Sequence, residues 1–366
     1  MADLLKNLYN PQFFERILPV FKRNLGQFDE NRFIHCVFDD EWPDLELKQR
    51  VRKISTALHV FMPSEFPKCV EILKRLVKDF TESFNKQGFE LIFLADYVEQ
   101  YGKDFFSESM DAIETITALV SCEYAIRPFL ISQQKLTIAQ LVKWSKHPDA
   151  NVRRLASEGC RPRLPWAMGV PELKKHPELI LPVLSNLKDD PSEYVRRSVA
   201  NNLNDISKDH PQLVLSIAKD WKGISERTDK LVRHACRGLM RQGSNDVFLL
   251  HGYRPQINAE LREFLLSRKK VAIGGELSFR LKIRNAEATL HKFRLDYGID
   301  YLTSTGKTSR KVFKLKDGYF SPGEEVVISK TQKLKHLSTR RLYKGKHTLS
   351  ILINGETIAR KEFALL

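Results

Sequence analysis

Long hydrophobic runs are scarce in this sequence of 366 residues. The longest, such as the segment 91–95, fall far short of the roughly 20 apolar residues that a membrane-spanning helix needs. The opening residues 1–6 carry an acid at position three and no apolar block, so we expect no secretory leader. Five cysteines are scattered without a framework spacing, which indicates a reducing, cytoplasmic location and a fold that needs no disulfide.

Several motifs of common enzymes are also missing. The sequence has no Walker loop, no glycine-rich dinucleotide fingerprint and no Gly-x-Ser-x-Gly elbow. The pairs His35/Cys36 and His234/Cys236 offer two soft ligands each, but no set of four has zinc-like spacing. We therefore expect neither a metal ion nor a cofactor.

Positive charge is abundant and unevenly distributed. The chain has 60 basic and 45 acidic residues, a net charge of +15, and the last 96 residues (271–366) account for +10 of it. A concentrated positive charge favours a polyanionic partner. Nucleic acid is the first candidate and an anionic membrane is the second. No amphipathic helix with a Trp or Phe face accompanies the charge, so we expect no membrane contact.

The spacing of apolar residues changes character between residues 258 and 271. Before this segment, helical spacing is seen at 69–77, 138–144 and 213–219. After it, the alternation of strands is seen at 277–284, 293–299, 326–329 and 347–353, with turns expected at 317–318, 322–323 and 354–355. We predict a helical domain over 1–257, a basic linker over 258–270, and a strongly basic antiparallel β-sandwich of the immunoglobulin type over 271–366.

A repeat runs through the helical part. The segment around Val152 (149–156) recurs around Val195 (191–199) and more weakly around Val232 (229–236). These valines are 43 and 37 residues apart, and a unit of about 40 residues with two helices is typical of HEAT-like repeats. We therefore predict a mainly α fold in which a HEAT-like α-solenoid precedes the sandwich. The concave face of such a solenoid suits a long cylindrical ligand.

An arginine pair follows the valine in two of these repeats. The first arginine, Arg153 or Arg196, is expected to be structural, because in HEAT-type repeats it often pairs with an acid near the second helix. The second, Arg154 or Arg197, lies about 100° further around the helix. It either lines the concave groove as a phosphate contact or is an ordinary solvated side chain.

The most distinctive segment is 157–166, Ser-Glu-Gly-Cys-Arg-Pro-Arg-Leu-Pro-Trp. Its glycine weakens a helix and its first proline ends it, so Glu158 lies in a last turn where the helix dipole disfavours a carboxylate. Arg161, Arg163 and Trp166 would then place two cations and a large ring at a groove. In the alternative interpretation, Trp166 is a core anchor and Glu158 simply pairs with Arg161.

The segments 158–166 and 195–211 closely resemble the DNA alkylation repair glycosylases of the AlkC/AlkD superfamily, on the AlkC side. This resemblance spans the predicted solenoid. The β-rich tail is similar in architecture to the immunoglobulin-like extension of one AlkC subgroup, so the resemblance covers close to the full chain. It implies an enzyme, a DNA glycosylase that removes N-alkylated bases.

The resemblance also implies site residues. The acids are Glu123, within the segment 121–128, together with Glu158 and Asp205, and Trp166 is the aromatic wall. The acids are 35 and then 47 residues apart, which places one in each of three successive repeats. Stacking of repeats is expected to bring them to the same groove.

The implied reaction is carboxylate-assisted hydrolysis of the glycosidic bond. An N3-alkylated adenine or cytosine is cationic on its sugar and departs as a neutral base. Acids near the sugar then stabilise the developing oxocarbenium charge, and one of them can orient the attacking water. The resemblance further implies that the lesion is not fully flipped out of the duplex.

The expected partner is double-stranded DNA containing alkylated bases, bound by a monomer at the nucleoid of a bacterial cytoplasm. The expected DNA contacts are Arg154, Arg161, Arg163, Arg197, Lys269 and Lys270. The alternative function is a non-enzymatic HEAT-repeat scaffold that binds DNA or a protein. A pure binder of a polyanion should avoid carboxylates in its groove, so the three acids favour the enzyme.

Overall fold

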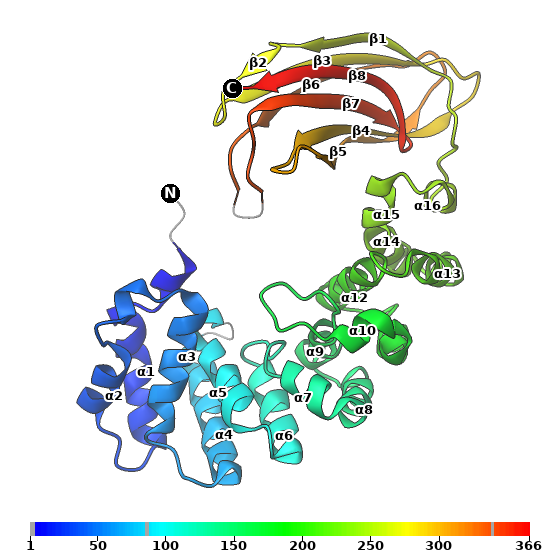
Figure 1. Cartoon of the computed structure of the whole chain (residues 1–366). Helices are drawn as coiled ribbons and strands as arrows, with labels where there is room; N and C mark the ends of the chain where they lie inside the picture. Colours follow the sequence, from blue (N-terminus) through cyan, green and yellow to red (C-terminus); the bar gives the residue numbers. More distant parts are fainter. Residues whose placement is uncertain (1–3, 85–87, 338–339) are drawn as a thin grey trace. The chain divides into compact units, whose positions relative to one another are not determined.

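The computed structural model describes residues 4–84, 88–337 and 340–366. The first three residues, part of the segment in which no leader was expected, lie outside this description. The chain folds as two compact units, one made of residues up to 209 with 223–235, the other of residues 210–222 with 236–366. The first unit is helical and the second contains the strands (Figure 1). The predicted order of a helical-repeat region followed by a β-sandwich is confirmed.

The helices of the first unit follow one another as stacked, roughly antiparallel segments (Figure 1). They are α1 (Pro11–Asn24), α2 (Glu30–Val37), α3 (Leu47–His59), α4 (Phe66–Ser83), α5 (Phe93–Tyr101), α6 (Phe106–Thr117), α7 (Arg127–Ser132), α8 (Gln134–Trp144), α9 (Ala150–Gly159), α10 (Pro171–Lys175), α11 (Leu181–Asn186), α12 (Glu193–Ile206) and α14 (Glu226–Ala235). Short 3-10 turns occur at η1 (Leu5–Leu8), η2 (Trp42–Asp44), η3 (Phe89–Ile92) and η4 (Pro177–Ile180).

The repeat seen in the sequence corresponds to helices that pack against one another. Val152, Val195 and Val232 lie on α9, α12 and α14, and each is at most 1% exposed. Helix α12 packs against both α9 and α14. Asp149 begins α9 as its N-cap, because its carboxylate accepts a hydrogen bond of 2.7 Å from the backbone N–H of Asn151.

The first arginine of each pair makes structural contacts, as predicted, and Arg153 also joins two neighbouring repeats. Arg153 makes a two-pronged contact with Asp190, with Nε and Nη2 at 2.7 and 3.1 Å from the two carboxylate oxygens. Arg196 Nη1 donates to the backbone oxygens of Asp190 and Pro191 at 2.5 and 2.9 Å. Both guanidiniums satisfy groups at the turn before α12, and the contact from Arg153 of α9 fixes the position of that turn relative to α9.

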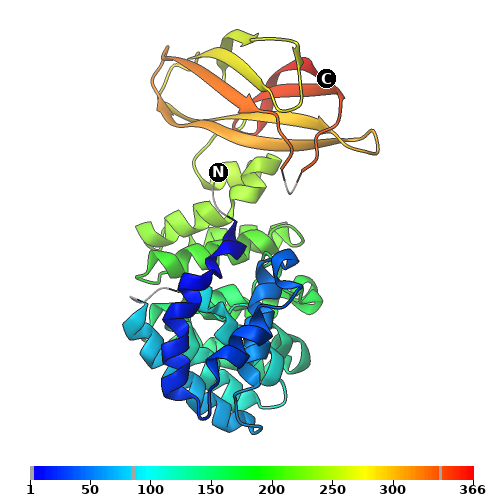
Figure 2. The same cartoon turned by 90° about the vertical axis from the view of Figure 1, so that its left-hand side faces the viewer.

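The described residues of the second unit form a two-layered β-sandwich and three helices (Figure 2). Its elements are α13 (Pro211–Trp221), α15 (Arg237–Gln242), α16 (Asn245–Leu250), β1 (Ala259–Leu266), β2 (Lys270–Val271), β3 (Glu276–Asn285), β4 (His291–Leu302), β5 (Thr308–Phe320), β6 (Glu325–Lys333), β7 (Gly345–Ile353) and β8 (Glu356–Leu365). One sheet has the order β1-β3-β6 and the other β2-β8-β7-β4-β5. Neighbouring strands are antiparallel except for the short parallel pair β2 and β8.

Two of the three predicted turns are present and one is wrong. Gly323 (φ 74°) turns the chain between β5 and β6, and Asn354 with Gly355 (φ 47° and 87°) forms the tight β7–β8 hairpin. Asp317 and Gly318 do not form a turn. Strand β5 continues through them, with Gly318 opposite Phe293 of β4.

The expected linker over 258–270 also differs from the structure. Strand β1 occupies most of it and pairs with β3, from Ala259 opposite Asn285 to Leu266 opposite Phe279. The alternating side chains of β1 include buried Phe264, which joins the sandwich core. The helices before this segment, α15 and α16, lie in the same compact unit as the sandwich.

A buried ion pair lies where these helices meet the sheet. Arg294 and Asp296 of β4 are 2.7 Å apart and are both almost fully buried. Arg294 also reaches Met240 Sδ of α15 at 3.2 Å, and the Tyr253 hydroxyl, just beyond α16, donates to Asp317 at 2.7 Å. The helical segment after residue 235 is therefore structurally part of the sandwich unit.

All five cysteines are free thiols, and four of them are buried.

Among the residues that the structure describes, no helix combines the length and the apolar character that a membrane crossing needs.

Candidate active site

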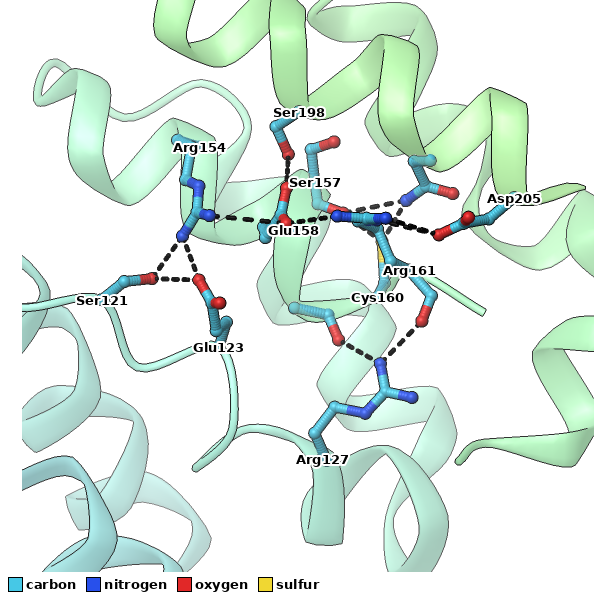
Figure 3. A network of polar contacts seen from close by, with 12 residues as sticks. Ser121, Glu123, Arg127, Arg154, Ser157, Glu158, Cys160, Arg161, Ser198 and Asp205 are labelled. Carbon is cyan, nitrogen blue, oxygen red and sulfur yellow. Dashed lines mark hydrogen bonds and ion pairs between the residues drawn. The ribbon is translucent and has the colours of Figure 1, made fainter. Parts of the chain in front are cut away.

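Five charged side chains of the first unit form a continuous chain of ion pairs, which we call the charged network (Figure 3). Their order is Glu123, Arg154, Glu158, Arg161, Asp205, so acids and arginines alternate. None of the five side chains is more than 16% exposed. The structure thus brings together the three acids that the sequence placed in three successive repeats.

Glu123 forms one end of the charged network. It lies in the segment between α6 and α7, where the Ser121 hydroxyl donates to its Oε2 atom at 2.9 Å. Arg154, from α9, donates from Nη1 to the same Oε2 and to Ser121 Oγ, the latter at 2.5 Å. One guanidinium nitrogen therefore ties the segment 121–123 to helix α9.

Glu158 occupies the centre of the charged network, in the last turn of α9. Its Oε1 atom accepts from Arg161 Nη1 at 2.6 Å and lies 3.4 Å from Arg154 Nη2. Its Oε2 atom accepts from the Ser198 hydroxyl of α12 at 2.7 Å. A carboxylate is disfavoured at a helix C-terminus, and two guanidiniums compensate for that position here.

Asp205 forms the other end, in the last turn of α12, and its side chain is only 3% exposed. Arg161 donates to its Oδ2 atom from Nε at 2.9 Å, and Nη2 is also 2.9 Å from the same oxygen. Lys208, one turn later, donates to Oδ1 at 3.2 Å from a half-exposed side chain. Asp205 is thus fixed on both oxygens.

The two arginines keep their charge although they are buried. Burial opposes the charge on Arg154, but Glu123 and Glu158 outweigh it and raise the pKa of the guanidinium. Burial acts in the same way on Arg161, and Glu158 and Asp205 raise its pKa. Each guanidinium is therefore a fixed cation between two acids.

Arg127 braces the segment that carries the centre of the charged network (Figure 3). It is 1% exposed, and its Nη1 atom donates to the backbone oxygens of Gly159 at 2.9 Å and Arg161 at 2.7 Å. Its Nε atom donates to the Met168 oxygen at 2.8 Å. Burial lowers the pKa of Arg127 to about 10, which still leaves it protonated at neutral pH. Arg127 therefore satisfies the carbonyls at the end of α9 and holds the loop 160–170 at both ends.

A pocket of about 580 Å³ opens beside the Glu123 end of the charged network. Glu123 and Arg154 line it together with three aromatic residues, Phe89, Tyr124 and Tyr194. The Arg154 guanidinium lies 5.1 Å from the ring centroid of Tyr194. Aromatic rings beside charged groups are typical of surfaces that contact nucleic acid bases and sugars.

Trp166 lines a smaller neighbouring pocket, which shares Phe89 and Tyr124 with the first. Its side chain belongs to the loop between α9 and α10 and is 63% exposed, so the interpretation of Trp166 as a core anchor is wrong. Its backbone has a φ of 62°, in the left-handed region that favours glycine. Its carbonyl accepts a 2.7 Å hydrogen bond from Lys48 Nζ of α3.

The expected DNA contacts fall into two groups. Arg154 and Arg161 are held between carboxylates and are nearly buried, which differs from their expected place as open phosphate contacts. The reason is that each lies between acids from neighbouring repeats, which the linear sequence does not reveal. The remaining four side chains are exposed: Arg163 with Asp209, Arg197 with Glu193, and Lys269 and Lys270 at the start of the sandwich.

Sequence reasoning missed several residues that shape the site. Arg127 left a signal, because it occupies the first position of α7, where the helix dipole disfavours a cation. Tyr124 follows Glu123 directly and could have been included on adjacency alone. Ser198 and Tyr194 left no signal that distinguishes them from other polar and aromatic residues of α12.

The fold and this site together define a class of protein. It has helical repeats that gather acids from three consecutive units into one buried network, and an immunoglobulin-like sandwich follows them. A family model described as the C-terminal Ig-like domain of the uncharacterised protein YhaZ matches residues 260–366.

Comparison with known proteins specifies the family. The chain is 39% identical over 356 residues to the uncharacterized protein YhaZ of Bacillus subtilis (strain 168). The aligned region covers 97% of this chain and 97% of YhaZ. It is also similar to the alkylpurine DNA glycosylase AlkC of Pseudomonas fluorescens, solved bound to DNA containing an abasic site analog. That match has 34% identity, a TM-score of 0.92 and full coverage of both chains. The chain belongs to the family of YhaZ and AlkC, which confirms the resemblance noted in the sequence.

Proposed function

We propose that this protein is a DNA glycosylase that removes cationic N-alkylated bases, of the 3-methyladenine and 3-methylcytosine type, from double-stranded DNA. The observation that carries the proposal is the convergence of three carboxylates from three successive repeats in one network. Membership of a family that includes an alkylpurine DNA glycosylase supports it. A pure binder of a polyanion should avoid a group of acids with net negative charge in its groove, because that charge repels phosphate.

The chemistry requires negative charge near the sugar. A base that is already cationic leaves as a neutral molecule, so the main demand is stabilisation of the oxocarbenium ion that forms on the deoxyribose. Three carboxylates and two guanidiniums give the charged network a formal charge of −1. The arginines fix the acids in place before DNA binds, and preorganised charge of this kind is the largest contribution in many enzymes.

The three acids have different surroundings, which suggests different roles. Both oxygens of Glu158 and both of Asp205 are occupied by hydrogen bonds, and both side chains are nearly buried. Among the described contacts, Glu123 uses only Oε2, and it lines the open pocket. We assign orientation of the attacking water to Glu123, and stabilisation of the sugar cation to Glu158 and Asp205.

Trp166 is assigned the role of an aromatic wall. An indole that is 63% exposed is accessible to an incoming duplex. This supports excision of a lesion that is not fully flipped out of the helix, which differs from the usual base-flipping route.

The exposed cations are assigned to the DNA backbone. Arg163 and Arg197 lie at the surface of the first unit, and Lys269 and Lys270 at that of the second. Each of these side chains is accessible to a phosphate. The two arginines would have to give up their ion pairs with exposed acids to bind one, and such surface ion pairs are weak. We propose that the protein binds DNA as a monomer in the cytoplasm.

The test is a base-release assay on defined duplexes. Purified protein is incubated with oligonucleotide duplexes that each carry one 3-methyladenine, 3-methylcytosine or 7-methylguanine, and abasic sites are detected by alkaline cleavage. We expect release of at least one cationic base. Uracil serves as the control lesion, because a neutral base needs protonation on leaving and should be released poorly. Tight DNA binding without release of any base, or rapid release of uracil, would contradict the proposal.

A further inference from the structure

Trp166 is held in an unusual backbone conformation. With a φ of 62°, it adopts a left-handed geometry in which its Cβ is crowded. Bulky residues keep such a conformation only where the surrounding structure fixes it, and this kind of strain is common at functional sites. The exposed indole gains no packing in the core that could explain the strain. The cause has to lie in what the backbone of Trp166 contacts.

Two cations from elsewhere in the first unit hold the loop 160–170. Arg127 fixes its base through the carbonyls of Arg161 and Met168. Lys48 fixes its tip, because its ammonium group donates a 2.7 Å hydrogen bond to the carbonyl of Trp166 itself. The same ammonium lies 4.9 Å from the ring centroid of Tyr124, the residue next to Glu123.

We propose that Lys48 is a positioning residue that sets the orientation of Trp166 relative to Tyr124 and the charged network. Its hydrogen bond fixes the direction of the Trp166 carbonyl, and this constraint maintains the left-handed backbone from which the indole projects. The cation-π contact with Tyr124 fixes the ammonium on its other side. Lys48 thus couples α3 to a loop 118 residues further along the chain. The catalytic part of this inference rests on the proposed function.

Tryptophan fluorescence gives a readout of this role that does not depend on activity. Trp42, Trp144 and Trp221 are at most 8% exposed, whereas Trp166 is 63% exposed. Acrylamide therefore quenches Trp166 preferentially, and the variant Trp166→Phe identifies its contribution. The anisotropy of this quenchable fraction reports how firmly the indole is held in the absence of DNA.

The variants are Lys48→Met, Lys48→Arg and a matched control, Lys53→Met. Methionine keeps an unbranched side chain of nearly the same length and removes the donor, whereas arginine restores a donor and a cation. Lys53 lies in the same helix, α3, and pairs with Asp39, so its replacement causes the same charge change away from the loop. All three are made in the full chain.

We expect Lys48→Met to lower the anisotropy of the Trp166 fluorescence. Single-turnover excision at saturating protein should fall by about tenfold, since small misplacements of a positioning group have effects of this size or larger. DNA affinity should change little, Lys48→Arg should restore both properties, and Lys53→Met should leave them unchanged.

Unaltered Trp166 fluorescence in Lys48→Met would overturn the inference. If DNA binding is weakened at the same time, Lys48 is a phosphate contact instead. If the wild-type protein releases no base, the proposed function fails, but the fluorescence of the free protein still decides whether Lys48 positions Trp166.

Discussion

At the scale of single residues, the position of Glu158 is the most informative feature. A carboxylate in the last turn of a helix is unfavourable, and this misfit is visible in the sequence. The structure accounts for it with Arg154, Arg161 and Ser198, all within hydrogen-bonding or ion-pairing distance of the carboxylate. The cost at the helix end is offset by two ion pairs that also connect Glu158 to the other acids.

Replacing Glu158 with Gln should separate catalysis from binding. The change removes one negative charge from the charged network, which is proposed to lie beneath a bound polyanion, so DNA affinity should stay the same or increase. Excision should fall by about 10² or more, as is typical when one preorganised electrostatic group is lost. Single-turnover excision and equilibrium binding, measured side by side, test this.

A surface acid supplies the matched control for that experiment. Glu226→Gln makes the same change of charge on α14, where Glu226 pairs only with exposed Lys230 among the described contacts. It should leave excision unchanged. If Glu158→Gln retains the wild-type rate, or loses activity only because it unfolds, Glu158 has a structural role and the scaffold interpretation gains support.

Residue identities were easier to predict than residue partners. The spacing of the repeat correctly predicted a structural role for Arg153, although its acid partner, Asp190, lies 37 residues away before the next repeat helix. The pairing of Arg161 with Glu158, one of the two interpretations of the segment 157–166, is present, but the further partners Glu123 of Arg154 and Asp205 of Arg161, 31 and 44 residues away, were not predicted. Which acid faces which arginine depends on the packing of three helices, and the linear pattern does not contain that information.

At the scale of secondary-structure elements, the end of α9 determines where two of the acids lie. Gly159 closes this helix, and a Cβ atom there would lie 2.7 Å from Ile126 Cγ2, in the segment that carries Glu123. The absence of a side chain at Gly159 therefore allows the Glu123 segment to approach α9 closely. Close backbone approach is a recurring reason for glycine within an element.

Gly159→Ala should therefore reduce both stability and excision. Overpacking of a buried contact costs about 1–3 kcal/mol, which exceeds the roughly 1 kcal/mol that alanine gains over glycine in a helix. Denaturant unfolding and single-turnover excision measure the two effects. The second-site change Ile126→Ala relieves the contact, so the double variant should recover part of the lost activity. A double variant that is no more active than Gly159→Ala alone argues against this steric coupling.

The strands show which turn signals are reliable. Asn354 and Gly355 both adopt positive φ in the β7–β8 hairpin, so this pair forms the expected tight turn. Asp317 and Gly318 are a similar pair of residues within β5, where Asp317 instead accepts a hydrogen bond from Tyr253. A similar pair of residues thus forms a turn in one place and lies within an edge strand in the other, where Asp317 and Gly318 pair with Arg294 and Phe293 of β4.

At the scale of the whole molecule, charge and domain organisation were predictable to different degrees. The net charge of +10 over 271–366 follows directly from composition. The limits of the second unit did not follow, because β1 alternates weakly: Phe264 is the buried residue among its otherwise partly or fully exposed side chains. A strand with so little buried surface resembles a polar linker in the sequence.

The exposed lysines at the start of the sandwich allow a test of DNA binding in the intact chain. If Lys269 and Lys270 contact phosphates, replacing both with Gln should weaken binding and lower the slope of log K against log salt by up to about 1.8. The control replaces Lys22 and Lys68 of the first unit, which pair with Glu30 and Glu65 at the surface. If the test and control variants have the same slope of log K against log salt, Lys269 and Lys270 have another role.

The buried thiols have a consequence for the environment in which the protein is proposed to work. Cells that need removal of alkylated bases contain electrophiles, and the cysteine thiolate is the strongest nucleophile that proteins offer to them. Burial raises the pKa of Cys69, and it raises the pKa of Cys122, Cys160 and Cys236 to about 12. Cys160 follows Glu158 by two residues, and its buried thiol contacts the Ala156 and Ser157 carbonyls and accepts from Asn202, so its methylation would disrupt these contacts. By keeping these thiols protonated and out of contact with solvent, the fold protects the repair protein from the damaging agents whose products it is proposed to remove.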